Sequence, residues 1–421
     1  MPLPGHAELA APMRPDAFIW AAGIEDTFIT APHPKTGRTL DEYELCGHYA
    51  HWQDDLALMA GLGVRAARYG IPWHRIQPAA DTWDFTWADG PLSRLLELGI
   101  EPIVDLVHYG LPGWLSGAWG DPRLPEAMAL YARRVAERFA GRIRWWTPLN
   151  EPRITAWYCG KLGWWPPHAH GWRGYVAVLL PICRAIVLTC EALRAVDPEN
   201  VHAHVDATDL YDTDDTSCRA EADFRQELVF LALDLISGRV GRDHPLSPWL
   251  LRQGADEPSL EWFERHAVPL HCIGLNLYPL FTAKVLARGP GGLRVRMPYG
   301  EASIIDRLAT LYGQRYQRPL WISETASLNE RRGAWLEDSV AAVARSRAAG
   351  ADLRGYTWWP LFALVTWGYR QGSLPPGRYL RQMGLYDGDA ACVRLPTALV
   401  EAFRGHVASG LPQQRAVQHV R

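Results

Sequence analysis

The sequence lacks the features that mark several large classes of protein. Its 421 residues carry a formal net charge of only −3 with the two signs interspersed, so neither nucleic acid nor an acidic membrane surface is an expected partner. No Gly-x-Gly-x-x-Gly stretch follows the first predicted strand, which argues against a dinucleotide domain. His48 and His51 or His168 and His170 are not accompanied by a His-Glu-x-x-His motif or a Cys/His ligand set. No metal site and no cofactor are therefore predicted.

Paired cysteines and long apolar runs are also missing. The seven cysteines form no Cys-x-x-Cys pair and are odd in number, which is typical of reduced, mostly buried thiols in a cytoplasmic protein. Residues 1–15 contain no apolar stretch behind a basic start, so no targeting segment is expected. Apolar runs such as 176–182 are too short to span a bilayer, so no membrane partner is expected. The sequence leaves the oligomeric state open, a homo-oligomer included.

Aromatic residues, in contrast, are abundant. The chain has 20 Trp and 16 Tyr within a composition that is 48% hydrophobic. Aromatic rings enlarge a core, but they also stack on the C–H faces of sugars while their polar edges form hydrogen bonds. A small-molecule carbohydrate or glycoside is therefore a candidate partner.

The chain alternates between short β-prone runs and helical patterns. Apolar residues at three- and four-residue steps predict helices that include 41–62, 125–140, 174–195 and 248–266, and residues 281–300 are predicted to form a loop. Strands are predicted at 17–22, 64–71, 101–108, 145–150, 201–205, 271–276, 320–323 and 354–359. No Pro/Ser-rich linker separates the halves. The pattern predicts one α/β domain over 1–421, with a core of about 17–408 and polar tails, built as a single (β/α)8 TIM barrel. A doubly wound open sheet is the alternative, because periodicity does not reveal closure.

Polar residues stand at or near the carboxyl ends of six of these predicted strands. In a closed barrel those ends converge on one mouth, where catalytic residues gather. The residues are Arg68, His108, Asn150, Glu151, Asn276, Tyr278, Glu324 and Trp359. Each alone has a structural explanation, such as a buried core histidine or a packed Trp ring. Their joint placement favours a shared site, and two strands ending in Glu151 and Glu324 predict a pair of catalytic carboxyl groups.

These stretches resemble glycoside hydrolase family 1, the β-glucosidase-like retaining enzymes. Asn150-Glu151-Pro152 and Ile322-Ser323-Glu324-Thr325 are similar to the two carboxylate motifs of that family, although Pro148 stands where the family has Thr. Further matches occur in family order, across about 18–386, at 46–49, 68–73, 108–112, 274–278 and 359–369.

The resemblance implies roles for the residues at the predicted mouth. Glu151 would be the general acid/base, with a raised pKa, and Glu324 the nucleophile that forms a covalent glycosyl-enzyme. Arg68 would keep Glu324 ionised, and Tyr278 would support it. The sugar would be held by Asn150 at its 2-OH, by His108 at another hydroxyl, and by the Trp359 ring; Asn276 lies in a matched motif.

The chain departs from the family where the sugar would be chosen. The family has a Gln near the end of the first strand, but residues 23–28 contain none, and Thr366 stands before Trp367 where the family has Glu. Glu25 or Asp26 is expected to replace these contacts, giving a retaining β-glycosidase with atypical glycone specificity.

Other functions remain open. Thr366, with Arg381 as a cation, also fits a 6-phospho-β-glycosidase. Transglycosylation is a further alternative, and so is a non-catalytic sugar-binding barrel, which predicts loss of a catalytic carboxylate. Near the entrance, Tyr109, Trp164 and Trp165 are expected either to line a second sugar site or to pack the rim.

Overall fold

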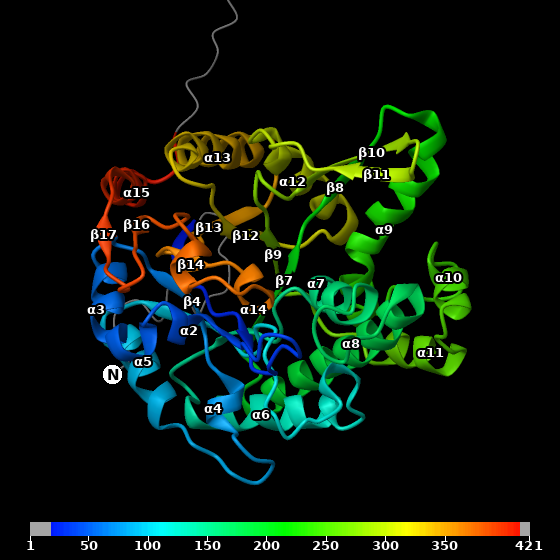
Figure 1. Ribbon diagram of the computed structural model, residues 1–421, viewed down its shortest axis with the longest axis horizontal. Coiled ribbons are helices and arrows are strands. Elements are labelled where there is room, and N and C mark those ends of the chain that lie inside the picture. Colours follow the sequence, from blue (N-terminus) through cyan, green and yellow to red (C-terminus); the bar gives the residue numbers. More distant parts are fainter. Residues whose placement is uncertain (1–17, 413–421) are drawn as a thin grey trace, which may run out of the picture.

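The computed structural model describes residues 18–412 and shows a closed barrel of eight parallel strands (Figure 1). Neighbours around the barrel follow the order of the sequence, and the last strand pairs with the first. The strands are β1 (Ile19–Gly23), β4 (Ala66–Gly70), β5 (Glu101–Asp105), β6 (Trp145–Thr147), β7 (Val201–Ala207), β9 (Cys272–Asn276), β12 (Leu320–Thr325) and β13 (Leu353–Trp358). The predicted (β/α)8 barrel is confirmed, and the open-sheet alternative is wrong. The segment 1–15, where no targeting signal is expected, lies outside the described residues, and the single-domain extent stays a prediction.

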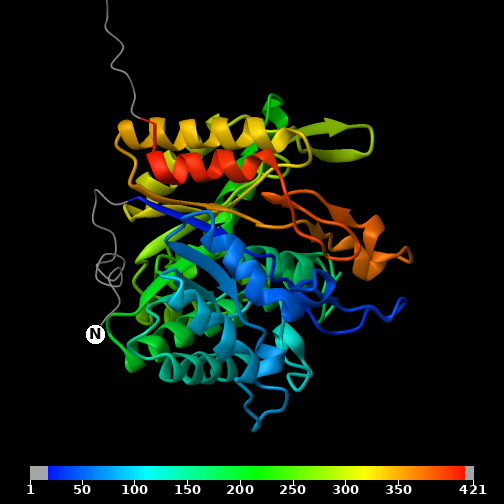
Figure 2. The same ribbon diagram turned by 90° about the vertical axis from the view of Figure 1, so that its left-hand side faces the viewer.

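Helices surround the barrel (Figures 1 and 2). They are α2 (Glu42–Leu45), α3 (His48–Ala60), α4 (Trp73–Ile76), α5 (Thr86–Glu97), α6 (Leu124–Arg138), α7 (Pro152–Ala156), α8 (Gly171–Val196), α9 (Arg219–Ile236), α10 (Ser247–Arg252), α11 (Glu257–Arg265), α12 (Ser303–Tyr316), α13 (Arg331–Ala348), α14 (Gly368–Gln371) and α15 (Ala398–Ser409). The single helix predicted over 41–62 is wrong, because Gly47 adopts a left-handed φ of 70° between α2 and α3. The helix predicted over 248–266 is likewise two helices, α10 and α11.

Short strands lie outside the barrel. They are β2 (Phe28–Ile29), β3 (Leu40–Asp41), β8 (Leu210–Asp212), β10 (Ala283–Gly289), β11 (Gly292–Arg296), β14 (Leu364–Val365), β15 (Leu380–Arg381), β16 (Tyr386–Asp387) and β17 (Leu395–Pro396). The loop predicted at 281–300 is therefore wrong, because β10 and β11 form an antiparallel hairpin there. Leu293 and Val295 alternate with arginines along β11, a period of two that was available in the sequence.

Helix α8 is long and apolar enough, by length and composition, to cross a membrane. The expectation that apolar runs are too short to span a bilayer was based on unbroken runs. An 18-residue window of α8 that includes polar residues has a mean hydropathy of 2.0. Within the protein, 61% of that window is buried, and α8 packs along α6. Such burial is usual for the core helix of a large barrel.

Side chains on the barrel strands alternate between the interior and the surrounding helices. The interior cluster contains Ala21, Ala66, Ile103, Trp145, Val201, Ala203, Cys272 and Trp321. Trp145 and Trp321 meet edge-on, with ring centroids 5.9 Å apart. Arg68 on β4 and Asp105 on β5 stand one inward position further toward the carboxyl ends, and Asn276 on β9 stands two inward positions beyond Cys272. Simple alternation therefore directs these three polar side chains to the mouth.

Candidate active site

Glu324 reaches the barrel mouth because β12 is irregular. Trp321 and Ser323 face the interior, so regular alternation would turn Glu324 outward toward the helices. The pairing of β12 with β9 instead shifts register between Ile322 and Glu324. Such a bulge re-aims a side chain. Glu324 is buried, with one carboxylate oxygen accepting a hydrogen bond from Arg68 and the other accepting from the Tyr278 hydroxyl at 2.8 Å.

Glu151 reaches the same mouth through a different irregularity. It has φ 46° and ψ 64°, a left-handed conformation, directly before α7 begins at Pro152. For a residue with a Cβ this conformation costs about 1–2 kcal/mol. The turn brings the Glu151 carboxyl group to the amide nitrogen of Asn276, at 2.9 Å, and to the hydroxyl of Tyr109, both of which donate to it. Backbone strain at this position is thus associated with the placement of a buried acid.

Arg68 connects the groups around Glu324. Its buried guanidinium donates to Glu324, to Asp105 at 2.6 Å and to the side-chain oxygen of Asn150 at 2.5 Å. It also lies 4.8 Å from the centre of the Trp359 ring. Burial raises the pKa of Glu324, and the Arg68 charge acts against that rise. Asp105, to which no role could be given from the sequence, is therefore part of the site.

Glu151 lies in a different electrostatic environment. Burial, followed by the negative charge of nearby Glu324, raises the pKa of Glu151 to about 7, while the hydrogen bonds from Tyr109 and Asn276 act against the rise. The two donors to Glu151 are neutral, whereas Glu324 accepts from a guanidinium. Two neighbouring carboxyl groups in such unequal surroundings are suited to different roles, one as an acid and one as an anion.

His108 and Asp26 lie next to the Arg68 network and contact each other. The His108 Nδ1 lies 2.6 Å from Asp26 and 3.1 Å from Asp105, and its Nε2 lies 2.9 Å from the amide nitrogen of Asn150. Asp26 is fully buried, and a Cβ built on Gly70 would come within 1.8 Å of its carboxylate. Asp26 is thus fully buried beside His108, and its contribution to the sugar pocket stays a prediction. The contact of His108 with a sugar hydroxyl stays a prediction.

Glu25 is hydrogen-bonded to one of the two tryptophans expected near the sugar, and Thr27 links it to the other. One of its carboxylate oxygens accepts from the Thr27 hydroxyl at 2.6 Å, and the other accepts from the Trp359 Nε1 at 3.3 Å. The Trp367 Nε1 in turn donates to the Thr27 hydroxyl at 3.3 Å. Glu25 is only partly buried, so it remains the candidate replacement for the missing family residues.

The ring of Trp359 is part of the barrel floor. It is 1% exposed and stacks on His108 at a centroid distance of 5.7 Å. Gly23 makes room for it, since a Cβ there would lie 1.9 Å from the ring. Trp359 therefore offers little free ring surface in this conformation, and its role as a stacking platform stays a prediction.

At the entrance, Trp164 and Trp165 differ in solvent exposure. Trp165 is 3% exposed and stacks on Tyr158, whereas Trp164 is 48% exposed. Trp165 also contacts Tyr109 and Trp367, with ring centroids 5.3 and 5.1 Å away. Trp165 thus packs the wall of the site, and Trp164 is the ring available to a ligand.

The predicted residues therefore divide into a connected set and a peripheral one. The connected set, joined by the contacts above, is Arg68, His108, Asn150, Glu151, Asn276, Tyr278, Glu324 and Trp359. Thr366 is half-buried and is tied through its backbone N–H to the Tyr379 carbonyl at 3.0 Å. Sequence reasoning missed Asp105 and Ser323, whose hydroxyl donates to Asn276 at 2.6 Å.

Tyr109 has a part in the site beyond the rim packing considered from the sequence. Its hydroxyl donates to Glu151 and so favours the ionised carboxylate. We expect Tyr109→Phe to raise the pKa of Glu151 and to move the basic limb of the kcat/KM–pH profile upward, because a proton on Glu151 is then held to higher pH. Tyr312→Phe, which alters a buried tyrosine on α12, is the matched control and should leave the profile unmoved. A basic limb that stays in place or moves downward in Tyr109→Phe would contradict this role.

Comparison with known proteins gives the same fold and indicates one family. A family model described as glycosyl hydrolase family 1 matches residues 21–214. β-Glucosidase A of Thermotoga maritima is 35% identical over 140 residues, which cover 32% of this chain and 31% of that protein, so the match spans about a third of the relative. An aryl-phospho-β-D-glucosidase of Bacillus subtilis is 24% identical over 390 residues, 82% of each chain. The solved family 1 β-glucosidase from Thermotoga maritima has a TM-score of 0.81 at 20% identity and covers 95% of this chain and 99% of its own, a likeness in fold.

Proposed function

The chain belongs to glycosyl hydrolase family 1, and from this premise we propose that it is a retaining β-glycosidase that hydrolyses a terminal β-linked sugar. One observation carries the proposal. Two buried carboxyl groups at the barrel mouth lie in unequal environments. Glu324 accepts hydrogen bonds from Arg68 and Tyr278, whereas Glu151 accepts from neutral donors and has its pKa raised to about 7. A retaining glycosidase needs one ionised carboxylate and one protonated carboxyl group close together.

Each carboxyl group has a defined part in the proposed reaction. Glu324 attacks the anomeric carbon, the bond from that carbon to the leaving oxygen breaks, and Glu151 gives its proton to that oxygen. In the second step Glu151 takes a proton from water, the water oxygen bonds to the anomeric carbon, and Glu324 leaves as a carboxylate. Arg68 holds Glu324 in place and favours its ionised form between turnovers.

We propose that the glycone preference is atypical and that Glu25 determines it. Glu25 already accepts from Trp359 and Thr27, and its partly exposed carboxylate can accept from sugar hydroxyls. We expect Glu25→Gln to raise KM and to lower kcat/KM by about ten- to a hundredfold, the effect of losing a hydrogen bond to a charged group. Glu44→Gln, an exposed change on α2, is the control. Steady-state kinetics on the best glycoside measures both, and an unchanged KM in Glu25→Gln would rule out this role.

A 6-phospho-β-glycosidase is the second candidate, favoured by the match to a phospho-β-glucosidase along most of the chain. The cation suggested for it is poorly placed, since Arg381 is exposed and donates to the carbonyls of Arg378 and Leu380. A panel of nitrophenyl β-glycosides, each assayed beside its 6-phosphate, separates the candidates. We expect faster turnover of an unphosphorylated glycoside, and preferential turnover of a phosphorylated one would overturn this choice.

The same panel addresses the remaining alternatives. Transfer of the glycosyl group to an added alcohol in preference to water would indicate a transglycosylase. Binding of a glycoside without turnover would indicate a non-catalytic sugar-binding barrel. The presence of both carboxyl groups disfavours this hypothesis. We further propose a cytoplasmic location, because all seven cysteines are free thiols.

A further inference from the structure

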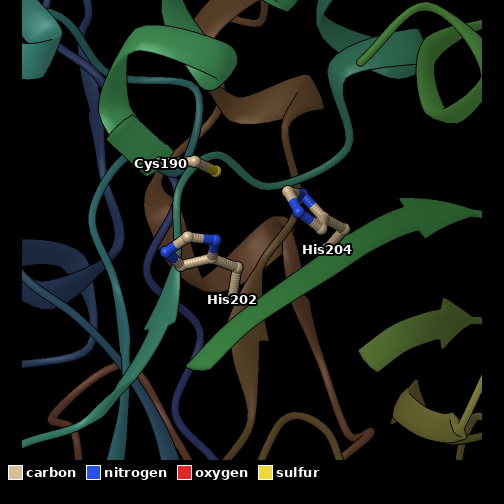
Figure 3. Close-up of side chains that lie close together, drawn as sticks. All are labelled: Cys190, His202 and His204. Atoms are coloured by element: carbon tan, nitrogen blue, oxygen red, sulfur yellow. The ribbon is translucent and has the colours of Figure 1, made fainter. Parts of the chain in front are cut away.

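Away from the active site, three potential metal ligands meet between the barrel and its longest helix. Cys190 lies on α8, and His202 and His204 lie on β7. One ligand atom from each residue lies within 4.8 Å of the other two, and all three side chains are buried. Figure 3 shows the Cys190 sulfur directed toward the space between the two rings.

The strand geometry explains why both histidines face the helix. Val201, Ala203 and Val205 point into the barrel, so the residues between them point outward, toward the surrounding helices. His202 and His204 are two residues apart and therefore lie on the same face of β7. Cys190 approaches that face from α8, which supplies a thiol where an apolar residue would complete an ordinary barrel layer.

Three of the four imidazole nitrogens of His202 and His204 have no hydrogen-bond partner among the described residues. Within residues 18–412, neither ring nitrogen of His202 and not the Nε2 of His204 has a hydrogen-bond partner, although both rings are buried. Buried polar nitrogens are normally satisfied, so three unpartnered ones in one cluster require an explanation. The other ring nitrogen of His204 bonds to the Pro269 carbonyl, which leaves the Nε2 lone pair directed at the cluster. A carbonyl that orients a histidine in this way is a common second contact of metal-ligating imidazoles.

Within the part of the chain that the structure describes, two other groups of acidic and histidine side chains lie close together, and an arginine binds each of them. Asp26, Asp105 and His108 belong to the active site, where Arg68 binds Asp105. Glu227, Asp234 and His244 surround Arg315, which donates to Asp234 at 2.6 Å and to Glu227 at 2.9 Å. The cluster of Cys190, His202 and His204 combines a thiol and two imidazoles, the ligand types preferred by thiophilic transition metals.

We propose that Cys190, His202 and His204 bind a zinc-type transition-metal ion that fastens α8 to β7. Ligand atoms around tetrahedral Zn²⁺ lie about 3.5 Å apart, so side-chain movements of about 1 Å would close the set. As the metal–sulfur bond forms, the Cys190 thiol gives its proton to solvent, and each histidine contributes a neutral nitrogen. Three protein ligands leave one tetrahedral position for water. The site is separate from Glu151 and Glu324, and its proposed role is structural.

The test is the metal content of untagged full-length protein produced with added Zn²⁺ and dialysed against metal-free buffer. We expect one zinc ion per chain in the wild type, and less than about a tenth of an ion in Cys190→Ser and in His204→Gln, because each removes one of three ligands. Cys183→Ser is the matched control, since Cys183 is equally buried two turns earlier on α8 and lies outside the cluster. It should retain the full zinc content. Thermal unfolding of the wild type should also occur at a higher temperature with zinc than with a chelator.

A second measurement covers the case in which the ligand variants do not fold. Wild-type protein produced with Co²⁺ should show sulfur-to-cobalt charge-transfer absorption and the intense visible bands of tetrahedral cobalt, and Cys183→Ser should show the same spectrum. Wild-type protein without bound zinc and without this cobalt spectrum would overturn the proposal, leaving the cluster as packing only. Equal loss of metal in Cys183→Ser would overturn it as well.

Discussion

Glu324→Ala is expected to lower kcat by about 10⁴-fold or more, because it removes the proposed nucleophile of the reaction. Azide should restore part of the activity by entering the space left by the carboxylate, and the product should then be the glycosyl azide of inverted anomeric configuration. Hydrolysis rates with and without azide, together with NMR of the product, measure both effects.

The control for this substitution is Glu97→Ala. Glu97 is a surface residue of α5 that pairs with Arg94 at 3.1 Å, so its loss should leave kcat unchanged. The assignment would fail if Glu324→Ala retained near-normal turnover. It would also fail if azide accelerated the reaction with no glycosyl azide among the products.

Arg68→Met is expected to produce the largest loss of stability among single changes in the site. Arg68 binds Glu324, Asp105 and Asn150 in the barrel mouth, so a methionine would leave two buried carboxyl groups without their cation. Breaking a buried ion pair from one side typically costs about 3–5 kcal/mol. Urea unfolding should show a decrease of that size in the free energy of unfolding.

The substitution Arg68→Lys distinguishes the effect of the positive charge of Arg68 from the effect of its planar guanidinium geometry. A lysine restores one positive charge but cannot present the planar fork that reaches three acceptors. We expect it to fold with a smaller loss of stability, and to lower kcat/KM by about 100-fold because Glu324 is misplaced. Arg134→Met, an exposed change on α6, should alter the free energy of unfolding by less than about 0.5 kcal/mol. Wild-type stability and kcat/KM in Arg68→Met would show that the network does not hold Glu324.

Much of the barrel could be predicted from sequence because its strands alternate. The inward positions of Arg68, Asp105 and Asn276 follow from a period of two once the strands are located. The hairpin of β10 and β11 escaped prediction because exposed glycines and arginines conceal its weaker alternation. The apolar length of helix α8 was underestimated from the sequence, because charged residues interrupt its apolar runs without ending the helix.

The two catalytic candidates could be located in the sequence, but their orientation could not be predicted. Glu324 would point away from the mouth if β12 were regular, and Glu151 is placed by a left-handed backbone conformation after β6 has ended. Neither irregularity leaves a fixed sequence signal. The exposure of Glu25 and Asp26 likewise depends on the tertiary structure, because Asp26 is fully buried beside His108 whereas Glu25 is only partly buried. Trp164 and Trp165 differ for the same reason.

The most direct test of the central claim is the anomeric configuration of the sugar when it is first released. Proton NMR of the wild-type reaction, recorded before mutarotation, follows the anomeric signal of the product from the best β-glycoside in the panel. The proposed roles of Glu151 and Glu324 predict that the β-anomer forms first, because two inverting steps at the anomeric carbon restore the configuration. Initial release of the α-anomer would indicate single displacement by water and would contradict a covalent intermediate on Glu324.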